Sequence, residues 1–270
     1  MKMIIMDLDG TLLNRDLKII DLTRETLMSY QKAGISLVLS SGRDVKSVME
    51  VGHGLLMEDY PQNLYVCLNG LDIYNNKGEL VHEEQKLSRD DAIEICNIAK
   101  GYHMDILFFF EKEMYALEYA HTGMINDHFM TTVKHPVQSV EEIPEHEFTC
   151  LKKIAFLQSE DVILKDLIPL QKEINKHYDL CKVEDTWLEI NPKGLSKGHA
   201  LEVISQLKNI PLSEMIAFGN GENDIDMLKT AGVGVAMENS YDTVKAAADV
   251  VCRHCDDNGI AHYLLENYPL

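Results

Sequence analysis

The sequence is short of positive charge. It has 25 Lys and Arg residues against 44 Asp and Glu residues, which gives a formal net charge of −19 over 270 residues. A field of this sign repels the phosphate backbone of a nucleic acid, so we expect no nucleic acid partner. It does not exclude a small phosphorylated ligand, because a bound metal ion and one or two nearby cations can reverse the potential within a site.

Long hydrophobic runs and an export signal are also missing. No stretch approaches the length of a membrane span, so we expect no membrane partner. The apolar residues at the start stop at Asp7, too early for the core of a secretory signal. Without an export signal, the six cysteines are expected to be reduced in a cytoplasmic protein. They are Cys67, Cys96, Cys150, Cys181, Cys252 and Cys255.

A complete zinc motif is the third absence. Cys252 and Cys255 have a zinc-like spacing, and His262 follows nearby, but no second Cys-x-x-Cys pair is present. Structural zinc sites need four ligands. We therefore interpret the pair as two thiols near the end of a strand.

The first segment of the chain carries paired acids after a buried strand. Met3–Met6 is an apolar run, typical of a strand buried on both faces of a parallel sheet. It ends in Asp7 and Asp9, followed by Gly10. Ligands of open α/β sheets bind at the carboxyl ends of the strands, and two carboxylates there suit Mg²⁺ with a phosphate completing its shell. A solvated acidic turn is the alternative interpretation.

A hydroxyl and a glycine end the second predicted strand. The strand 35–40 is followed by Ser41 and Gly42, and helical spacing resumes at Asp44. A hydroxyl and free backbone N–H groups at the start of a helix can bind an anion, although serine is also an ordinary helix cap.

Two later segments repeat this arrangement. Lys197 stands at the start of a predicted helix, where a cation opposes the helix dipole and gains little structurally. The strand 214–218 ends in the polar run 219–224. Polar residues thus gather again at the carboxyl end of a strand.

The order of elements predicts an α/β fold with two domains. Strands and helices alternate up to about residue 83, which indicates a doubly wound parallel sheet. A helix and strand layer of α+β character follows, with paired strands at 105–110 and 113–118 and a helix at 119–132. We predict a core domain over 1–82 and 186–270, with an inserted domain over 83–185.

The run Asp7–Leu12 resembles the first motif of the haloacid dehalogenase superfamily of phosphohydrolases. Ser41, Lys197 and the run 219–224 resemble its second, third and fourth motifs, in the same order across the chain. The insertion resembles the C2 cap of the Cof-like (type IIB) branch. The resemblance implies a Rossmann-like core with an α+β cap, and phosphatase chemistry.

The resemblance also implies residue roles. Asp7 is expected to attack phosphorus and form an aspartyl-phosphate, and Asp9 to act as general acid and base. Mg²⁺ is expected on Asp7, the Asp9 carbonyl and Asn220, with Asp224 supporting from further out. The groups expected to bind phosphate are Leu8 (N–H), Ser41, Gly42, Lys197 and Asn223.

One position departs from the family pattern, which usually has aspartate where this chain has Asn220. The sequence therefore leaves two alternative functions open. The first is a Mg²⁺-dependent phosphatase of a small phosphorylated metabolite, and the second is a phospho-ligand-binding or regulatory protein in which Asn220 has weakened catalysis. A phosphomutase is a third alternative. Neither the substrate nor the oligomeric state is indicated. The inserted domain offers Tyr102, His103, Tyr115, Tyr119 and His121 as polar-tipped candidates for substrate contact, although packing is the more common role of such residues.

Overall fold

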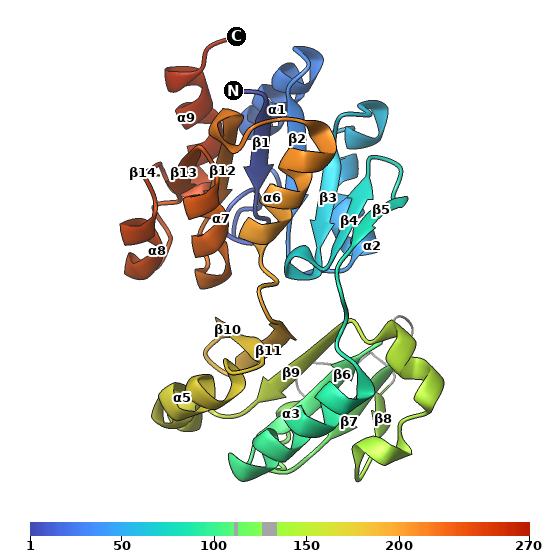
Figure 1. Ribbon diagram of the computed structural model, residues 1–270. Helices are drawn as coiled ribbons and strands as arrows, with labels where there is room; N and C mark the ends of the chain where they lie inside the picture. Colours follow the sequence, from blue (N-terminus) through green and yellow to red (C-terminus); the bar gives the residue numbers. More distant parts are fainter. Residues whose placement is uncertain (111–112, 126–133) are drawn as a thin grey trace. The chain divides into compact units, whose positions relative to one another are not determined.

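The computed structural model describes residues 1–110, 113–125 and 134–270 (Figure 1). The chain divides into two compact units. We call Met1–Glu84 with Leu195–Leu270 the core unit, and Gln85–Gly194 the inserted unit. The predicted boundary at 185–186 differs from this division, because Trp187–Pro192 pairs with strands of the inserted unit and belongs to its sheet.

The core unit is built on an eight-stranded sheet in the order β14-β13-β12-β1-β2-β3-β4-β5. Six strands run parallel, and β4 and β5 extend one edge in antiparallel pairing. The strands are β1 (Met3–Met6), β2 (Ser36–Ser40), β3 (Leu64–Cys67), β4 (Asp72–Asn75), β5 (Leu80–Glu83), β12 (Met215–Gly219), β13 (Val233–Ala236) and β14 (Val250–Val251). The predicted doubly wound α/β fold is confirmed.

Helices cover both faces of this sheet. They are α1 (Asp21–Lys32), α2 (Val45–His53), α6 (Lys197–Lys208), α7 (Ile225–Thr230), α8 (Asp242–Ala247) and α9 (Gly259–Asn267). Ile4 and Met6 pack in the cluster that contains residues of α1, α2 and α9, whereas Met3 and Ile5 pack in the cluster with α6, α7 and α8. Strand β1 is apolar throughout because both its faces are buried.

The direction of winding changes beside β1. The chain adds β2 and β3 on one side of β1, and β12, β13 and β14 on the other. Loops that leave the carboxyl ends of β1 and β12 therefore diverge. This is the topological switch point at which open α/β sheets bind their ligands.

The inserted unit has its own six-stranded sheet, in the order β10-β11-β9-β6-β7-β8. Its elements are α3 (Arg89–Gly101), β6 (Asp105–Phe109), β7 (Met114–Leu117), β8 (Lys134–Pro136), β9 (Lys153–Leu157), α5 (Glu160–Ile174), β10 (Tyr178–Glu184) and β11 (Trp187–Pro192). Helices α3 and α5 pack with alternate residues of the sheet, such as Ile106 and Phe108, in one cluster. The predicted pairing of the strands now named β6 and β7 is confirmed.

The helix predicted over 119–132 lies largely outside the described residues. Within the described ranges, no helix has both the length and the apolar character needed to cross a bilayer.

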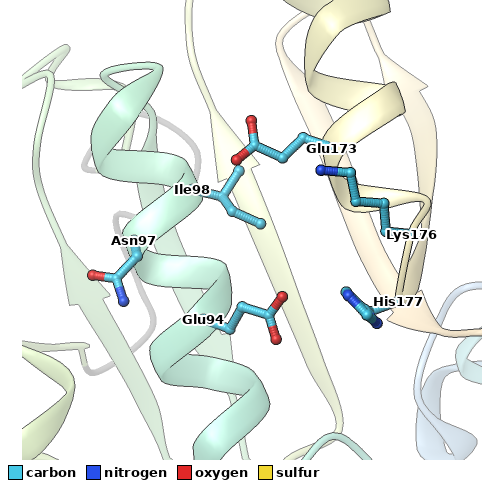
Figure 2. A pocket seen from close by; sticks show the side chains of 6 residues that line it. All are labelled: Glu94, Asn97, Ile98, Glu173, Lys176 and His177. Carbon is cyan, nitrogen blue, oxygen red and sulfur yellow. The ribbon is translucent and has the colours of Figure 1, made fainter.

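A pocket of about 290 Å³ lies between α3 and the end of α5 (Figure 2). It is lined by Glu94, Asn97, Ile98, Glu173, Lys176 and His177. Tyr178 donates a hydrogen bond to Glu94 (3.0 Å), and Tyr102 donates one to Glu173 (3.1 Å). Both acids therefore already have structural partners, and none of the residues predicted for catalysis lines this pocket.

Candidate active site

A buried lysine links two acids that are far apart in the sequence. Lys197, the first residue of α6, is only 1% exposed. Its Nζ atom donates to Asp7 Oδ1 at 2.7 Å and to Asp224 Oδ1 at 2.6 Å. Asp7 directly follows β1, and Asp224 lies in the turn after β12. The neighbouring carboxyl ends of these two strands bring the acids together, and the lysine compensates their charge.

The buried charges shift one another's pKa values. Burial raises the pKa of Asp7 to about 7, Asp224 adds to the rise, and Lys197 and the Leu8 N–H oppose it. Burial alone would lower the pKa of Lys197, but Asp224 and Asp7 hold it above its ordinary value. Strongly perturbed groups in a crevice are typical of active sites.

Asp9 has a different environment. Its side chain is 49% exposed, and its two carboxylate oxygens accept hydrogen bonds from Arg43. Arg43 Nε lies 2.9 Å from Asp9 Oδ2, and Nη2 donates to Oδ1. Asp7 and Asp9 thus have separate cationic partners, Lys197 and Arg43.

Three oxygen-bearing groups, on Asp7, Asp9 and Asn220, lie close together. A terminal atom of the Asn220 amide lies 3.2 Å from Asp7 Oδ2 and 2.8 Å from the carbonyl oxygen of Asp9. Two neighbouring ligands of an octahedral Mg²⁺, each about 2.1 Å from the ion, are about 3 Å apart. The donor set and its spacing therefore fit Mg²⁺ when the amide oxygen faces inward.

Both carboxylate oxygens of Asp224 accept hydrogen bonds from the protein itself. Its Oδ2 atom accepts from the backbone N–H groups of Asn220 and Gly221, both at 2.9 Å, and its Oδ1 atom accepts from Lys197. The carboxylate therefore shapes the turn after β12 and orients the lysine. Its predicted support of the metal stays a prediction.

The groups predicted to bind phosphate lie at adjacent strand ends. Ser41 and Gly42 directly follow β2, and the Ser41 hydroxyl accepts from the Arg43 N–H at 3.2 Å. Asn223 Nδ2 donates to Asn69 Oδ1 at 3.2 Å. A Cβ atom on Gly42 would lie 3.2 Å from that same oxygen, so the glycine lets the Asn69 amide lie against the backbone.

The sequence reasoning missed Asn69. Asn69 and Gly70 lie in the turn between β3 and β4, which pair as a hairpin. Asn69 is also buried, adopts φ 56°, and holds Asn223. The sequence does carry a signal for Asn69, because it is a polar residue that follows a buried strand, as Asp7 and Ser41 do.

Among the polar-tipped candidates of the inserted unit, the three tyrosines have structural partners, whereas the two histidine side chains are exposed. Tyr102 bonds Glu173, Tyr115 is buried against Phe110 and His135, and Tyr119 packs against the main cluster of this unit. His121 is exposed beside Glu118. His103 adopts φ 51°, and its carbonyl oxygen accepts from Gln158.

The Cys252–Cys255 pair does not form a four-ligand site in the described part of the chain. Cys255 lies with His254 and Asp256, three groups close enough to hold an ion. His254 Nδ1, however, accepts from the Asp256 N–H at 3.0 Å, and Asp256 pairs with Arg15. The interpretation as ordinary thiols agrees with this arrangement.

A family model matches almost the whole chain. The model of the haloacid dehalogenase-like hydrolases matches residues 4–264. The chain belongs to this family. Among its relatives is a 5-amino-6-(5-phospho-D-ribitylamino)uracil phosphatase of Bacillus subtilis, 28% identical over 96% of this chain and 93% of the relative.

Solved structures agree with the family assignment. A haloacid dehalogenase-like hydrolase from Bacteroides thetaiotaomicron is 27% identical, with a TM-score of 0.78 over 99% of each chain. The subclass IIB sugar phosphatase BT4131 has the same fold, with a TM-score of 0.80 and 22% identity over the whole of both chains. The predicted Cof-like haloacid dehalogenase membership and the phosphoric monoester hydrolase class are confirmed.

Proposed function

We propose that this haloacid dehalogenase-like hydrolase cleaves small phosphate monoesters in a Mg²⁺-dependent reaction through an aspartyl-phosphate on Asp7. The observation that carries the proposal is the position of Asp7. Asp7 lies at the end of the central strand and accepts from buried Lys197 on one oxygen; the Asn220 amide lies beside its other oxygen and also beside the Asp9 carbonyl.

The reaction has two steps, the formation of the aspartyl-phosphate and its hydrolysis. A carboxylate oxygen of Asp7 attacks phosphorus, the bond to the ester oxygen breaks, and Asp9, in its protonated form and released from Arg43, gives that oxygen its proton. A water then attacks the same phosphorus, Asp9 takes the water's proton, and the bond to Asp7 breaks. Inorganic phosphate leaves, and both aspartates return to their starting forms.

The other residues orient and neutralise the phosphoryl group. The Leu8 and Gly42 N–H groups, the Ser41 hydroxyl and the Asn223 amide would donate to its oxygens. Lys197 would contribute its buried charge. A Mg²⁺ ion held by Asp7, the Asp9 carbonyl and Asn220 would neutralise further negative charge.

Substrate size and selection follow from charge and domain organisation. The net charge of −19 disfavours polyanionic substrates, so the proposal is a small phosphorylated metabolite. Relatives with this fold act on such molecules, as the name of the ribitylaminouracil phosphatase states. We assign the choice among metabolites to the inserted unit, in the role of a C2-type cap.

The test is hydrolysis of p-nitrophenyl phosphate and a panel of phosphorylated metabolites, with Mg²⁺ and with a chelator. Turnover should require Mg²⁺ and be absent from Asp7→Asn. The matched control is Asp16→Asn, the same change at an exposed site of the core unit. A wild type that binds phosphorylated ligands but turns none over would contradict the proposal and favour the phospho-ligand-binding alternative.

A further inference from the structure

The side-chain amide of Asn220 ends among oxygen atoms. Its inner terminal atom lies 2.7 Å from Thr11 Oγ1, 2.8 Å from the Asp9 carbonyl oxygen and 3.2 Å from Asp7 Oδ2. Carbonyl and ionised carboxylate oxygens only accept hydrogen bonds. With no cation between them, an amide oxygen at this position can accept from the Thr11 hydroxyl but faces the acceptor oxygens of Asp9 and Asp7, whereas the two N–H groups of an amide nitrogen can donate to those two oxygens.

The outer end of the amide agrees with this orientation. The outer terminal atom faces donor groups, which suit an oxygen. It also lies close to Gly10, where a Cβ atom would come within 2.7 Å of it. Gly10 adopts φ +77° and leaves room for either end of the amide, since C=O and NH₂ have almost the same shape.

We propose that the Asn220 amide has two functional orientations. In the metal-free protein, Nδ2 points inward and its N–H groups take the place of the cation. When Mg²⁺ binds, the amide turns about its Cβ–Cγ bond and presents Oδ1 as a ligand. The second half of this inference rests on the proposed function, because it needs the metal; the first half does not.

Aspartate, the residue usual in this family, cannot act in this way. A carboxylate at position 220 has no proton to donate, and it would face Asp7 Oδ2 and the Asp9 carbonyl with only acceptor atoms. Such a site is destabilised unless a cation fills it. The N–H groups of Asn220 therefore satisfy the acceptor oxygens of the metal-free site. Mg²⁺ must break these hydrogen bonds when it binds.

The wild-type protein allows a direct test by NMR. Protein labelled with ¹⁵N at asparagine is recorded without metal and through a Mg²⁺ titration, and the Asn220 signal is identified by its loss in Asn220→Ser. We expect side-chain N–H protons that exchange slowly with water when metal is absent, and a large shift and faster exchange as Mg²⁺ binds.

Thermal unfolding gives a second readout that needs no activity. Without metal, Asn220→Asp should melt roughly 4–8 °C below wild type, because buried acceptors lose their donors. With Mg²⁺ it should recover most of the loss, whereas the wild type should gain much less. Asn97→Asp, the same change at an exposed site of α3, should behave like wild type in both conditions. Because Asn220 precedes Gly221, the mass of this peptide is checked for deamidation first.

The outcomes separate the inference from the proposed function. Rapidly exchanging Asn220 protons in the metal-free protein, or a metal-free Asn220→Asp that is as stable as wild type, overturn the inference alone. Mg²⁺ binding that leaves the amide signal unchanged also overturns it and leaves the phosphatase proposal intact. A protein that binds no Mg²⁺ overturns both the rotation and the proposed cofactor.

Discussion

The guanidinium group of Arg43 binds both carboxylate oxygens of Asp9. Nε and Nη2 donate to one oxygen each, so the pair is bidentate. Arg43 follows β2 and Asp9 follows β1, so the pair joins the ends of two adjacent strands. Two parallel hydrogen bonds fix the plane of the carboxylate as well as its position, which one ammonium group cannot do.

Arg43 should therefore influence catalysis through Asp9. General acid–base catalysis contributes about 10²–10⁴-fold to a rate, and a mobile Asp9 should lose part of that. We expect Arg43→Lys to lower kcat about 10-fold, and Arg43→Ala more. The loss should be larger for an alkyl phosphate than for p-nitrophenyl phosphate, whose leaving group needs little protonation. Equal losses for the two substrates would show that Arg43 does not act through the acid.

Replacing the nucleophile should separate catalysis from folding. Asp7→Asn keeps the side-chain volume and removes the attacking oxygen, so turnover and the phosphorylated Asp7 peptide should both disappear. Burial already disfavours the charged form of Asp7, since its pKa is raised to about 7. The melting temperature of the variant should therefore stay within a few degrees of wild type. Substantial residual phosphatase activity would exclude the aspartyl-phosphate.

Removing Lys197 should cost stability as well as activity. Lys197→Ala leaves the carboxylates of Asp7 and Asp224 buried without their cation, a change that typically costs about 3–5 kcal/mol. Activity should also fall, through lost stabilisation of the transferring group. Urea unfolding measures the first effect. Adding Asp224→Asn should restore part of the stability but not the activity, and a double variant no more stable than the single one would argue against a charge effect.

Glu84 should contribute stability that depends on pH. It accepts hydrogen bonds from His82 (2.8 Å) and His199 (2.9 Å). The bond from His82 lowers the pKa of the Glu84 carboxyl against the opposing effect of burial, and His199 lowers it further. A lowered folded-state pKa stabilises the protein above the unfolded pKa, and this stability is lost as pH falls through the folded value.

Glu84→Gln should thus be less stable than wild type at neutral pH, by up to about 1 kcal/mol for this partly exposed group. The difference should shrink below the ordinary glutamate pKa. Urea unfolding at neutral and acidic pH measures it, with Glu25→Gln on the exposed face of α1 as the matched control. A difference that stays constant between the two pH values would assign the effect to packing.

The sequence predicted the features that are local. Asp7 and Ser41 were identified because each follows an apolar run, and the sheet of the core unit formed with those runs as strands. The second predicted boundary, at 185–186, lies before Trp187–Pro192, which belongs to the sheet of the inserted unit. Which sheet a strand joins depends on its partners, here β9 and β10, and periodicity does not encode them.

Partners distant in the chain were also beyond local reasoning. Lys197 is 190 residues from Asp7, and an isolated lysine is expected to be solvated. Its burial, and the start of α6 at Lys197 itself, depend on two acids that only the folded sheet brings to it. The partner of Asp9 was hidden for the same reason, because Arg43 lies 34 residues away.

The hydrogen bond between Glu84 and His199 joins the two segments of the core unit on either side of the insertion. Glu84 is the last residue before the inserted unit, and His199 stands in the first turn of the first helix after it. Their side chains are 2.9 Å apart, so the chain leaves the core unit and returns to it at neighbouring points. All eight strands of the core sheet lie on one side or the other of this gap. Recombination can therefore exchange everything between Glu84 and Leu195 as a single segment and leave every strand of the core sheet in place.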